Sequence, residues 1–239
     1  MLYFSNFVTG KTIIMANCKD CKFRSPLFDK LTDEELEIIN ASKTTYSVPK
    51  GTSISKIGDP IHEFVYLVQG MVKLQKINKD GRAQIVSIAR PLDFVGLLSV
   101  FSDQTYQYSI TTLVDSTFCK IDLTVMRKVA SQNGQFALDI LKYISKVSDE
   151  IIRHTYAINS KNLRGRIAMI LLDFANKHFM SDTYTLPVSR KELAELIDMT
   201  PENVIRILSE FRRDGLVIVK GKHIEILDRK LLEKIRDLG

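Results

Sequence analysis

The spacing of apolar residues divides the chain into a β-rich part and a helical part. From Tyr46 to about Asp122, apolar residues fall in short β-prone runs separated by turn residues such as Asp80-Gly81, which is a strong hairpin signal. Many short strands at regular spacing are typical of a sandwich or a barrel-like roll. From about Leu123 the apolar residues recur at helical spacing instead.

A long helix is predicted directly after the β-rich part. Its apolar residues alternate spacings of three and four over three heptads, which is the a/d seam of a coiled coil. Such a helix either packs on its own domain or pairs with a second copy, and we expect the pair, because a complete β domain covers only part of it. We expect His154 to be a partly solvated seam residue, the alternative being a pH-sensitive histidine pair across a dimer. The candidate dimer seam is Ile140, Ile144, Val147, Ile151, His154 and Ile158.

Two helix starts and a turn mark the C-terminal module. Ser189 and Glu192 form a capping box that begins one helix, and Thr200 followed by Pro201 begins the next. Asp198 stands in the turn between them, where glycine is usual, and aspartate tolerates the left-handed conformation better than most residues. A hairpin with a basic tip follows. Two short helices and a hairpin make a winged helix-turn-helix.

The second helix of this module exposes side chains that suit a DNA major groove. Arg206 can pair bidentately with guanine, Glu202 can accept from cytosine, and Asn203 can read adenine or bond a phosphate. The helix starts and the basic wing suit phosphates. The alternative is that Glu202 and Arg206 only form a surface ion pair at i,i+4 spacing. The predicted DNA-binding residues are Ser189, Arg190, Thr200, Pro201, Glu202, Asn203, Ile205, Arg206, Ser209, Lys220 and Lys222.

The composition of the chain is compatible with binding to DNA, a polyanion, but does not by itself indicate it. The 239-residue chain has a formal net charge of +6 and is 45% hydrophobic, which supports a substantial core. No apolar run approaches the roughly 18–20 residues that span a bilayer, and the first segment lacks the basic region of a signal peptide. We expect a cytoplasmic protein with no membrane partner, beginning at Met1 or at Met15.

The order of β-roll, long helix and winged helix resembles the CRP/FNR superfamily (cyclic-AMP receptor protein / fumarate-nitrate regulator) of bacterial transcription factors. The resemblance runs from about Phe28 to Leu232 and is carried by VPKGTSISKIGDPIHEFVYLVQGMVKLQKINKDG and VSRKELAELIDMTPENVIRILSEF. It implies an α+β fold with a cyclic-nucleotide-binding-like β-roll (a double-stranded β-helix or jelly roll), a dimerisation helix and a C-terminal winged helix-turn-helix. It also implies a homodimer on two-fold symmetric DNA, base reading by Glu202 and Arg206, and RNA polymerase as a further partner.

The expected domain organisation follows from this order. The domains are a flexible tail at 1–24, a β-roll sensor domain at 25–132, a dimerisation helix at 133–159 and a DNA-binding domain at 160–239.

The resemblance places an effector pocket in the segment 94–110. Cyclic-nucleotide binders of the family carry a Gly-Glu for the ribose there and an Arg-Ser/Thr for the cyclic phosphate. Here Gly96 is present, Leu97 replaces the glutamate, and Gln107-Tyr108 or a near neighbour replaces the Arg-Ser. No basic residue lies in the segment, so a buried cyclic phosphate would lack a counter-charge, which argues against cyclic AMP in the usual mode. The pocket residues are Gly96, Leu97, Leu98, Gln107, Tyr108 and Ser109; the effector stays unidentified.

Three cysteines raise the question of a redox sensor. Oxygen-sensing relatives hold an iron–sulfur cluster with N-terminal cysteines and one at a place similar to Cys119, and Cys18 and Cys21 stand in the N-terminal segment. A cubane cluster usually needs four thiolates, and this chain has three cysteines. We expect free thiols; the alternatives are a cluster with one non-cysteine ligand, a zinc site or a thiol switch.

These features predict a homodimeric, sequence-specific DNA-binding transcription regulator that is gated by an effector through its β-roll. The alternatives are a sensory ligand-binding or protein-interaction module with degenerate DNA binding, and a redox or iron–sulfur variant of the same regulator class. An enzyme is not expected and no catalytic residue is assigned. His62 is the only histidine in the roll, so the usual metal triad cannot form.

Overall fold

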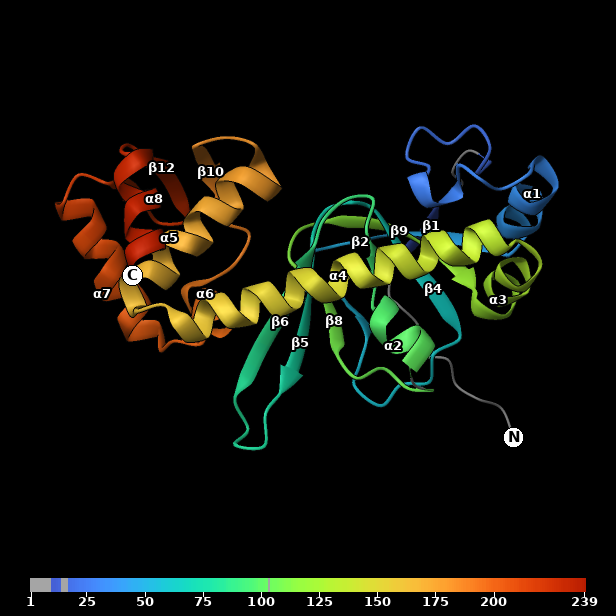
Figure 1. Cartoon of the computed structure of the whole chain (residues 1–239), viewed down its shortest axis with the longest axis horizontal. Coiled ribbons are helices and arrows are strands. Elements are labelled where there is room, and N and C mark those ends of the chain that lie inside the picture. Colours follow the sequence, from blue (N-terminus) through green and yellow to red (C-terminus); the bar gives the residue numbers. More distant parts are fainter. Residues whose placement is uncertain (1–9, 14–16, 103) are drawn as a thin grey trace. The chain divides into compact units, whose positions relative to one another are not determined.

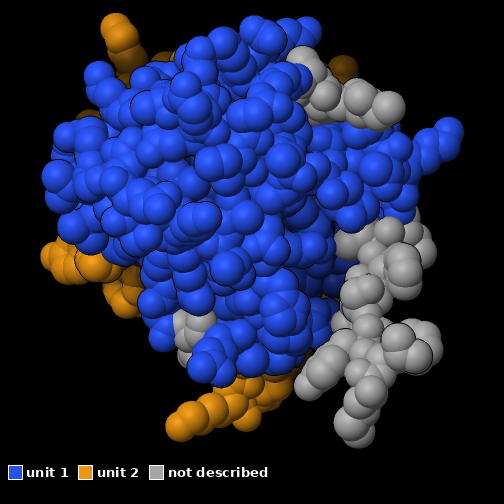
Figure 2. All heavy atoms as spheres, turned by 90° about the vertical axis from the view of Figure 1, so that its right-hand side faces the viewer, with its two compact units in different colours: residues 1–76, 86–149 blue, residues 77–85, 150–239 orange. Residues whose placement is uncertain are grey.

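The computed structural model describes residues 10–13, 17–102 and 104–239, and Figure 1 labels their helices and strands. The chain divides into two compact units, shown in different colours in Figure 2. The first comprises the described parts of 1–76 and 86–149, and the second comprises 77–85 and 150–239. The two alternative starts, Met1 and Met15, lie outside the described residues.

The first unit contains two sheets of short strands, as the turn spacing predicts. One sheet has the strand order β1-β2-β9-β4-β7 and the other β3-β8-β5-β6. Strand β9 pairs antiparallel with β2 and β4. Its consecutive residues Phe118 and Cys119 are both buried, so the strand is covered on both faces there. The strands are β1 (Lys11–Ile13), β2 (Lys43–Val48), β3 (Ser53–Ser55), β4 (Glu63–Gln69), β5 (Val72–Ile77), β6 (Ala83–Ala89), β7 (Phe94–Val95), β8 (Ser109–Thr112) and β9 (Ser116–Asp122). The end of β5 and the start of β6 lie within 77–85 and so belong to the second unit.

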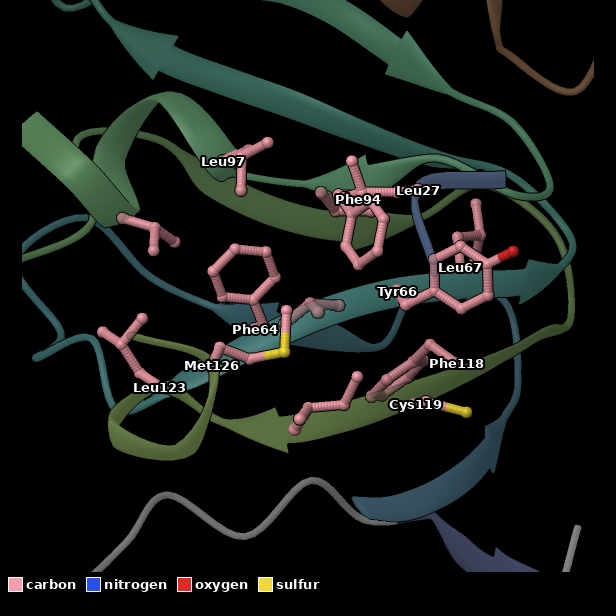
Figure 3. Close-up of a cluster of buried hydrophobic side chains, with 14 of the residues drawn as sticks. Leu27, Phe64, Tyr66, Leu67, Phe94, Leu97, Phe118, Cys119, Leu123 and Met126 are labelled. Carbon is pink, nitrogen blue, oxygen red and sulfur yellow. The ribbon is translucent and has the colours of Figure 1, made fainter. Parts of the chain in front are cut away.

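The core of this unit is aromatic at its centre. Phe64 of β4 and Phe94 of β7 meet edge to face with ring centroids 5.5 Å apart. Figure 3 shows this cluster, to which Phe118 of β9 and Met126 of the following helix also belong. Aromatic pairs of this kind contribute about 0.5–1.5 kcal/mol beyond the burial of their surface.

Helices of the first unit begin at polar caps. Thr32 and Glu35 form the predicted capping box of α1, and Asp122 caps α3. The long helix α4 follows Asn133, whose Oδ1 accepts from the Phe136 N–H at 3.0 Å. The helical elements are η1 (Pro26–Phe28), α1 (Asp33–Ala41), α2 (Leu97–Ser102), α3 (Leu123–Gln132) and α4 (Gly134–Ser160), the last continuing into the second unit.

Residues 17–24 pack on the first unit, which corrects the prediction that all of 1–24 is a flexible tail. Cys18 is buried, and its backbone N–H donates to Asn40 Oδ1 at 3.1 Å. The Tyr66 hydroxyl donates to the Phe23 carbonyl at 2.7 Å. This part of the N-terminal segment is therefore held by α1 and β4.

The second unit contains the predicted winged helix-turn-helix, with further helical elements before and after it. Its three strands are ordered β10-β12-β11. The C-terminal helix α8 was not predicted from the apolar pattern. Together with the first unit, this arrangement confirms the predicted α+β fold class. The elements are α5 (Leu163–Asp173), η2 (Phe174–Phe179), β10 (Thr183–Thr185), α6 (Arg190–Leu196), α7 (Pro201–Arg213), β11 (Val217–Lys220), β12 (His223–Ile226) and α8 (Arg229–Leu238).

The turn between β4 and β5 requires glycine for two reasons. Gly70 has a φ of +93°, which side-chain-bearing residues rarely adopt. A Cβ at this position would also lie 2.2 Å from Ser116 Oγ and 2.7 Å from the Asp115 carbonyl oxygen. Gly51 has a similar φ of +81° but open space around it.

We predict that Gly70→Ala destabilises the chain much more than Gly51→Ala. Strain at positive φ alone costs about 1–2 kcal/mol, and the collision at Gly70 adds about 1–3 kcal/mol. Urea unfolding of both variants and the wild type measures the difference. Equal losses for the two variants would show that the turn relaxes away from Ser116.

Candidate DNA-binding site and sensor region

Helix α7 is positioned by the turn that precedes it. Asp198 has a φ of +50°, as predicted for the turn, and the backbone N–H of Met199 bonds back to the Ala194 carbonyl at 3.0 Å. Arg166 of α5 donates through Nη1 to the carbonyl oxygens of Ile197 at 3.4 Å and Asp198 at 2.8 Å. Arg166 thereby bonds backbone carbonyls at and just after the C-cap of α6, where the helix itself supplies no N–H partner.

The helix caps of the module form as predicted. Ser189 Oγ accepts from the Glu192 N–H at 3.2 Å, and Thr200 Oγ1 accepts from the Asn203 N–H at 3.4 Å, with Pro201 as the first residue of α7. Because the Ser189 and Thr200 hydroxyls cap helices, a DNA phosphate that bound either hydroxyl would compete with its bond to the backbone N–H.

One face of α7 is apolar and the other is open. The buried residues Val204, Ile207, Leu208 and Phe211 recur at helical spacing. Glu202, Ile205, Arg206 and Ser209 are exposed. The hydroxyl of Ser209 donates to the Ile205 carbonyl at 2.9 Å, so it is already used within the helix.

Arg206 is held by two neighbours on its own helix. Its Nη1 donates to Glu210 Oε1 at 2.6 Å, and its Nη2 donates to Asn203 Oδ1 at 3.3 Å. The alternative interpretation pairs Arg206 with Glu202 at i,i+4 spacing; in the structure the partner of Arg206 at this spacing is Glu210 instead. Glu202 is exposed on the same open face of α7.

The wing carries the predicted basic residues. Lys220 at the end of β11 and Lys222 in the turn are both exposed. Arg190, which the sequence assigns to DNA binding, donates through Nη2 to the Gly221 carbonyl at 2.5 Å, and its burial lowers the pKa of the guanidinium. Arg190 thus supports the tip of the wing in this structure.

The space at Gly96 is occupied by the chain itself. Gly96 has a φ of +73°, and a Cβ there would lie 3.2 Å from Ile110 Cδ1 and 3.3 Å from Tyr106 Cε1. The Tyr106 side chain is buried, and its hydroxyl donates to the Glu63 carbonyl at 3.5 Å. Tyr106, which the sequence analysis did not single out, therefore fills room that a ligand near Gly96 would need.

The other predicted pocket residues also use their polar atoms internally. Gln107 Nε2 donates to the Thr105 carbonyl at 3.4 Å, and Ser109 Oγ donates to the Gln75 carbonyl at 3.1 Å. The remaining members are buried or half-buried apolar and aromatic side chains, namely Leu97, Leu98 and Tyr108.

Cys18 and Cys119 are both buried in the first unit. Cys119 Sγ lies 3.4 Å from Thr45 Oγ1 in the neighbouring strand. Burial raises the pKa of the Cys18 thiol and of the Cys119 thiol, and nearby Lys43 partly opposes both shifts. In the described ranges, no three His, Cys, Asp or Glu side chains are placed to hold a metal ion. Cys18, Cys21 and Cys119 supply three thiols, whereas a cubane cluster usually needs four thiolates.

We predict that Cys21 is alkylated first when the folded protein is treated with iodoacetamide. Cys21 is half-buried, whereas Cys18 and Cys119 are buried with raised pKa values, and the thiolate is the reacting form. Peptide mass spectrometry over time should show Cys21 reacting about tenfold faster or more. In urea the three rates should converge, and equal rates in the folded protein would contradict this burial.

The predicted dimer seam is not an open surface along its whole length. Ile140 and Ile158 are buried within the chain, and Ile144 packs against the core of the first unit. This corrects the prediction for these three residues. Val147, Ile151 and His154 are half-buried. Burial lowers the pKa of His154, which favours its neutral form.

A second apolar face of α4 is exposed. Its residues form two pairs, at 138 and 141 and at 152 and 156, on the side of the helix away from Ile140. Their exposed fractions run from 53% to 74%. This exposed apolar face consists of Leu138, Leu141, Ile152 and Tyr156.

Comparison with known proteins agrees with this layout. Residues 46–133 match the family described as cyclic nucleotide-binding domain, and residues 165–235 match the Crp-like helix-turn-helix domain. Similar proteins include the transcriptional activator protein anr of Pseudomonas aeruginosa, 26% identical over 226 residues that cover 91% of each chain. The transcriptional activator protein FnrL of Cereibacter sphaeroides is 28% identical over 235 residues, 94% of each chain.

Among solved structures, that of FixK2 from Bradyrhizobium japonicum has the same fold. Its TM-score is 0.74 at 23% identity, over 81% of this chain and 96% of that one. The chain belongs to the CRP/FNR superfamily of transcription regulators. Among the helices that the structure describes, none is both long and apolar enough to cross a membrane.

Proposed function

We propose that this protein is a homodimeric, sequence-specific DNA-binding regulator in which α7 reads the major groove. The observation that carries the proposal is the open face of α7, which presents Glu202 and Arg206 beside a basic wing. A helix of this kind enters the groove with its N-terminal residues against base edges. Arg206 would read guanine and Glu202 would accept from cytosine.

Backbone contacts would come from the surroundings of α7. Lys220 and Lys222 of the wing can neutralise phosphates, which supplies affinity without sequence information. The N–H groups in the first turn of α7, which begins at Pro201 after the N-cap Thr200, favour an anion. Asn203 is shared between this role and its bond to Arg206.

Dimerisation is proposed to occur along α4. The exposed apolar face of α4 groups four large apolar side chains on one side of the helix. Such a group favours a protein partner, whereas single exposed apolar residues do not. Two copies joined along α4 would present two α7 helices, which suits a two-fold symmetric operator. Val147, Ile151 and His154 are half-buried and lie on the same side of α4 as Ile140, so they are not part of this proposed contact.

Gating by an effector is proposed to run through the contact of α4 with the β domain. The Tyr143 hydroxyl of α4 accepts from the Phe94 N–H at 3.0 Å and donates to Asp93 Oδ1 at 3.4 Å. Phe94 begins the segment with the predicted pocket, so a change there reaches α4 directly. A ligand in this region would be uncharged or weakly charged, because the segment carries no cation.

The remaining parts of the proposal rest on the family. The domain division into 25–132, 133–159 and 160–239 is kept, with RNA polymerase as a partner of the DNA-bound form. A regulator of bacterial promoters acts in the cytoplasm, and we propose that location on this ground alone. The relatives are named as transcriptional activators, which supports a regulator over an enzyme.

We predict that the purified protein enriches a two-fold symmetric sequence from genomic fragments and that Arg206→Ala loses this preference. Removing a bidentate arginine costs about 1–3 kcal/mol at the base pair it reads. Sequencing of fragments bound at low and moderate salt is the measurement. Lys222→Ala is the control, and it should weaken binding evenly across sequences and lower the salt slope by about one. Equal enrichment by wild type and Arg206→Ala would contradict base reading by this arginine.

We predict that Leu141→Glu separates the dimer, whereas Lys146→Glu does not. A carboxylate placed in a desolvated contact has no partner, so the dimer dissociation constant should rise about 100-fold or more. Lys146 is exposed on another side of the same helix. Sedimentation equilibrium of both variants measures the change. A dimer that survives Leu141→Glu would place the contact elsewhere on the chain.

A further inference from the structure

Glu210 contacts the guanidinium groups of two arginines, Arg206 and Arg164. Its Oε1 accepts from Arg206 Nη1 at 2.6 Å, and its Oε2 accepts from Arg164 Nη1 at 2.9 Å. The Glu210 side chain is 20% exposed, against 56% for Arg206. Both carboxylate oxygens are therefore used, and the more buried partner can support the more exposed one.

Arg164 is fixed from two other directions. Its Nη2 donates to Asp214 Oδ2 at 2.9 Å, and its guanidinium lies 4.9 Å from the ring centroid of Phe211. The bond to Asp214, helped by Glu210, raises the pKa of Arg164. Phe211 is buried in the apolar face of α7. A continuous series of contacts thus runs from the core through Arg164 and Glu210 to Arg206.

We infer that Glu210 is a positioning residue that sets the direction of Arg206 for base reading. This inference rests on the proposed function. Reading guanine needs the flat guanidinium in one plane and one direction. Glu210 holds one Nη atom and Asn203 holds the other before DNA arrives. An unsupported surface arginine would lose its rotamer freedom on binding, which lowers affinity.

The same carboxylate works against DNA in general. A negative charge beside the groove-facing residues repels phosphates, so Glu210 lowers binding to every sequence. The contact of Glu210 with Arg206 strengthens binding only to DNA that carries the base pair read by Arg206. Glu210 therefore raises selectivity at the expense of overall affinity, which is how specificity is set against wrong partners.

The test compares Glu210→Gln with the wild type on an operator selected by the wild type. Glutamine keeps the shape but turns an amide N–H₂ toward one of the two arginine donors, so at most one contact survives. Competition titrations at fixed salt, with operators changed one base pair at a time, measure discrimination. We expect discrimination at the base pair that Arg206 reads to fall on the order of tenfold. Binding to non-operator DNA should stay equal or become tighter.

A matched control exists on α8. Glu233 lies four residues after Arg229 and pairs with it at 3.7 Å, which repeats the spacing and direction of the Arg206–Glu210 pair. Glu233→Gln removes the same charge and should leave discrimination unchanged. If Glu210→Gln fails to fold, Arg164→Lys tests the same support from its other end, because lysine cannot bond Glu210 and Asp214 as a planar fork. Discrimination should fall in that variant as well.

A double-mutant cycle separates positioning from a general structural effect. In an Arg206→Ala background, Glu210→Gln should cause no further loss of discrimination, because the residue that it directs is gone. A loss of the same size in both backgrounds would overturn the inference, as would a Glu210→Gln variant as selective as the wild type. A wild-type chain that selects no sequence overturns the proposed function itself, and the inference with it.

Discussion

The buried face of α7 decides where each DNA-facing side chain stands. Four apolar residues face the interior of the second unit, and α5, α6 and β11 pack on this helix. Because the helical period is 3.6 residues, burying this face turns Glu202 and Arg206 outward. Fully burying one such side chain contributes about 1.5–3 kcal/mol, whereas an exposed ion pair contributes at most about 1 kcal/mol. The apolar contacts therefore fix the helix, and the ion pairs adjust single side chains on it.

Local signals predicted the winged helix well. The capping residues Ser189 and Thr200 and the turn at Asp198 act within four residues of their own positions, so their chemistry can be read from neighbouring letters. The long-range contacts that hold the turn and Glu210 could not be predicted from neighbouring residues. Arg166 reaches the turn from about 30 positions away in the chain, and Arg164 reaches Glu210 over 46 positions. Only the packing of α5 against α7 brings these groups together.

The long helix shows the opposite limit of sequence reasoning. Its heptad pattern predicted a helix over 133–159, and α4 covers nearly the same residues. The pattern did not reveal that α4 has two apolar faces, one covered by its own chain and one exposed. Periodicity reports that a face is apolar but not which partner covers it. The segment 94–110 shows the same limit. Its lack of basic residues is evident from the sequence, but the packing of Tyr106 against Gly96 could not be predicted from it.

The exposed apolar face of α4 has a consequence for the response of the protein to its own abundance. On the proposed assembly, only a second copy covers that face, so the DNA-binding form depends on protein concentration. While monomers predominate, the amount of dimer grows with the square of total protein, and a twofold rise in synthesis gives about a fourfold rise in dimer. A cell could then sharpen the switch by controlling synthesis alone, before any effector acts.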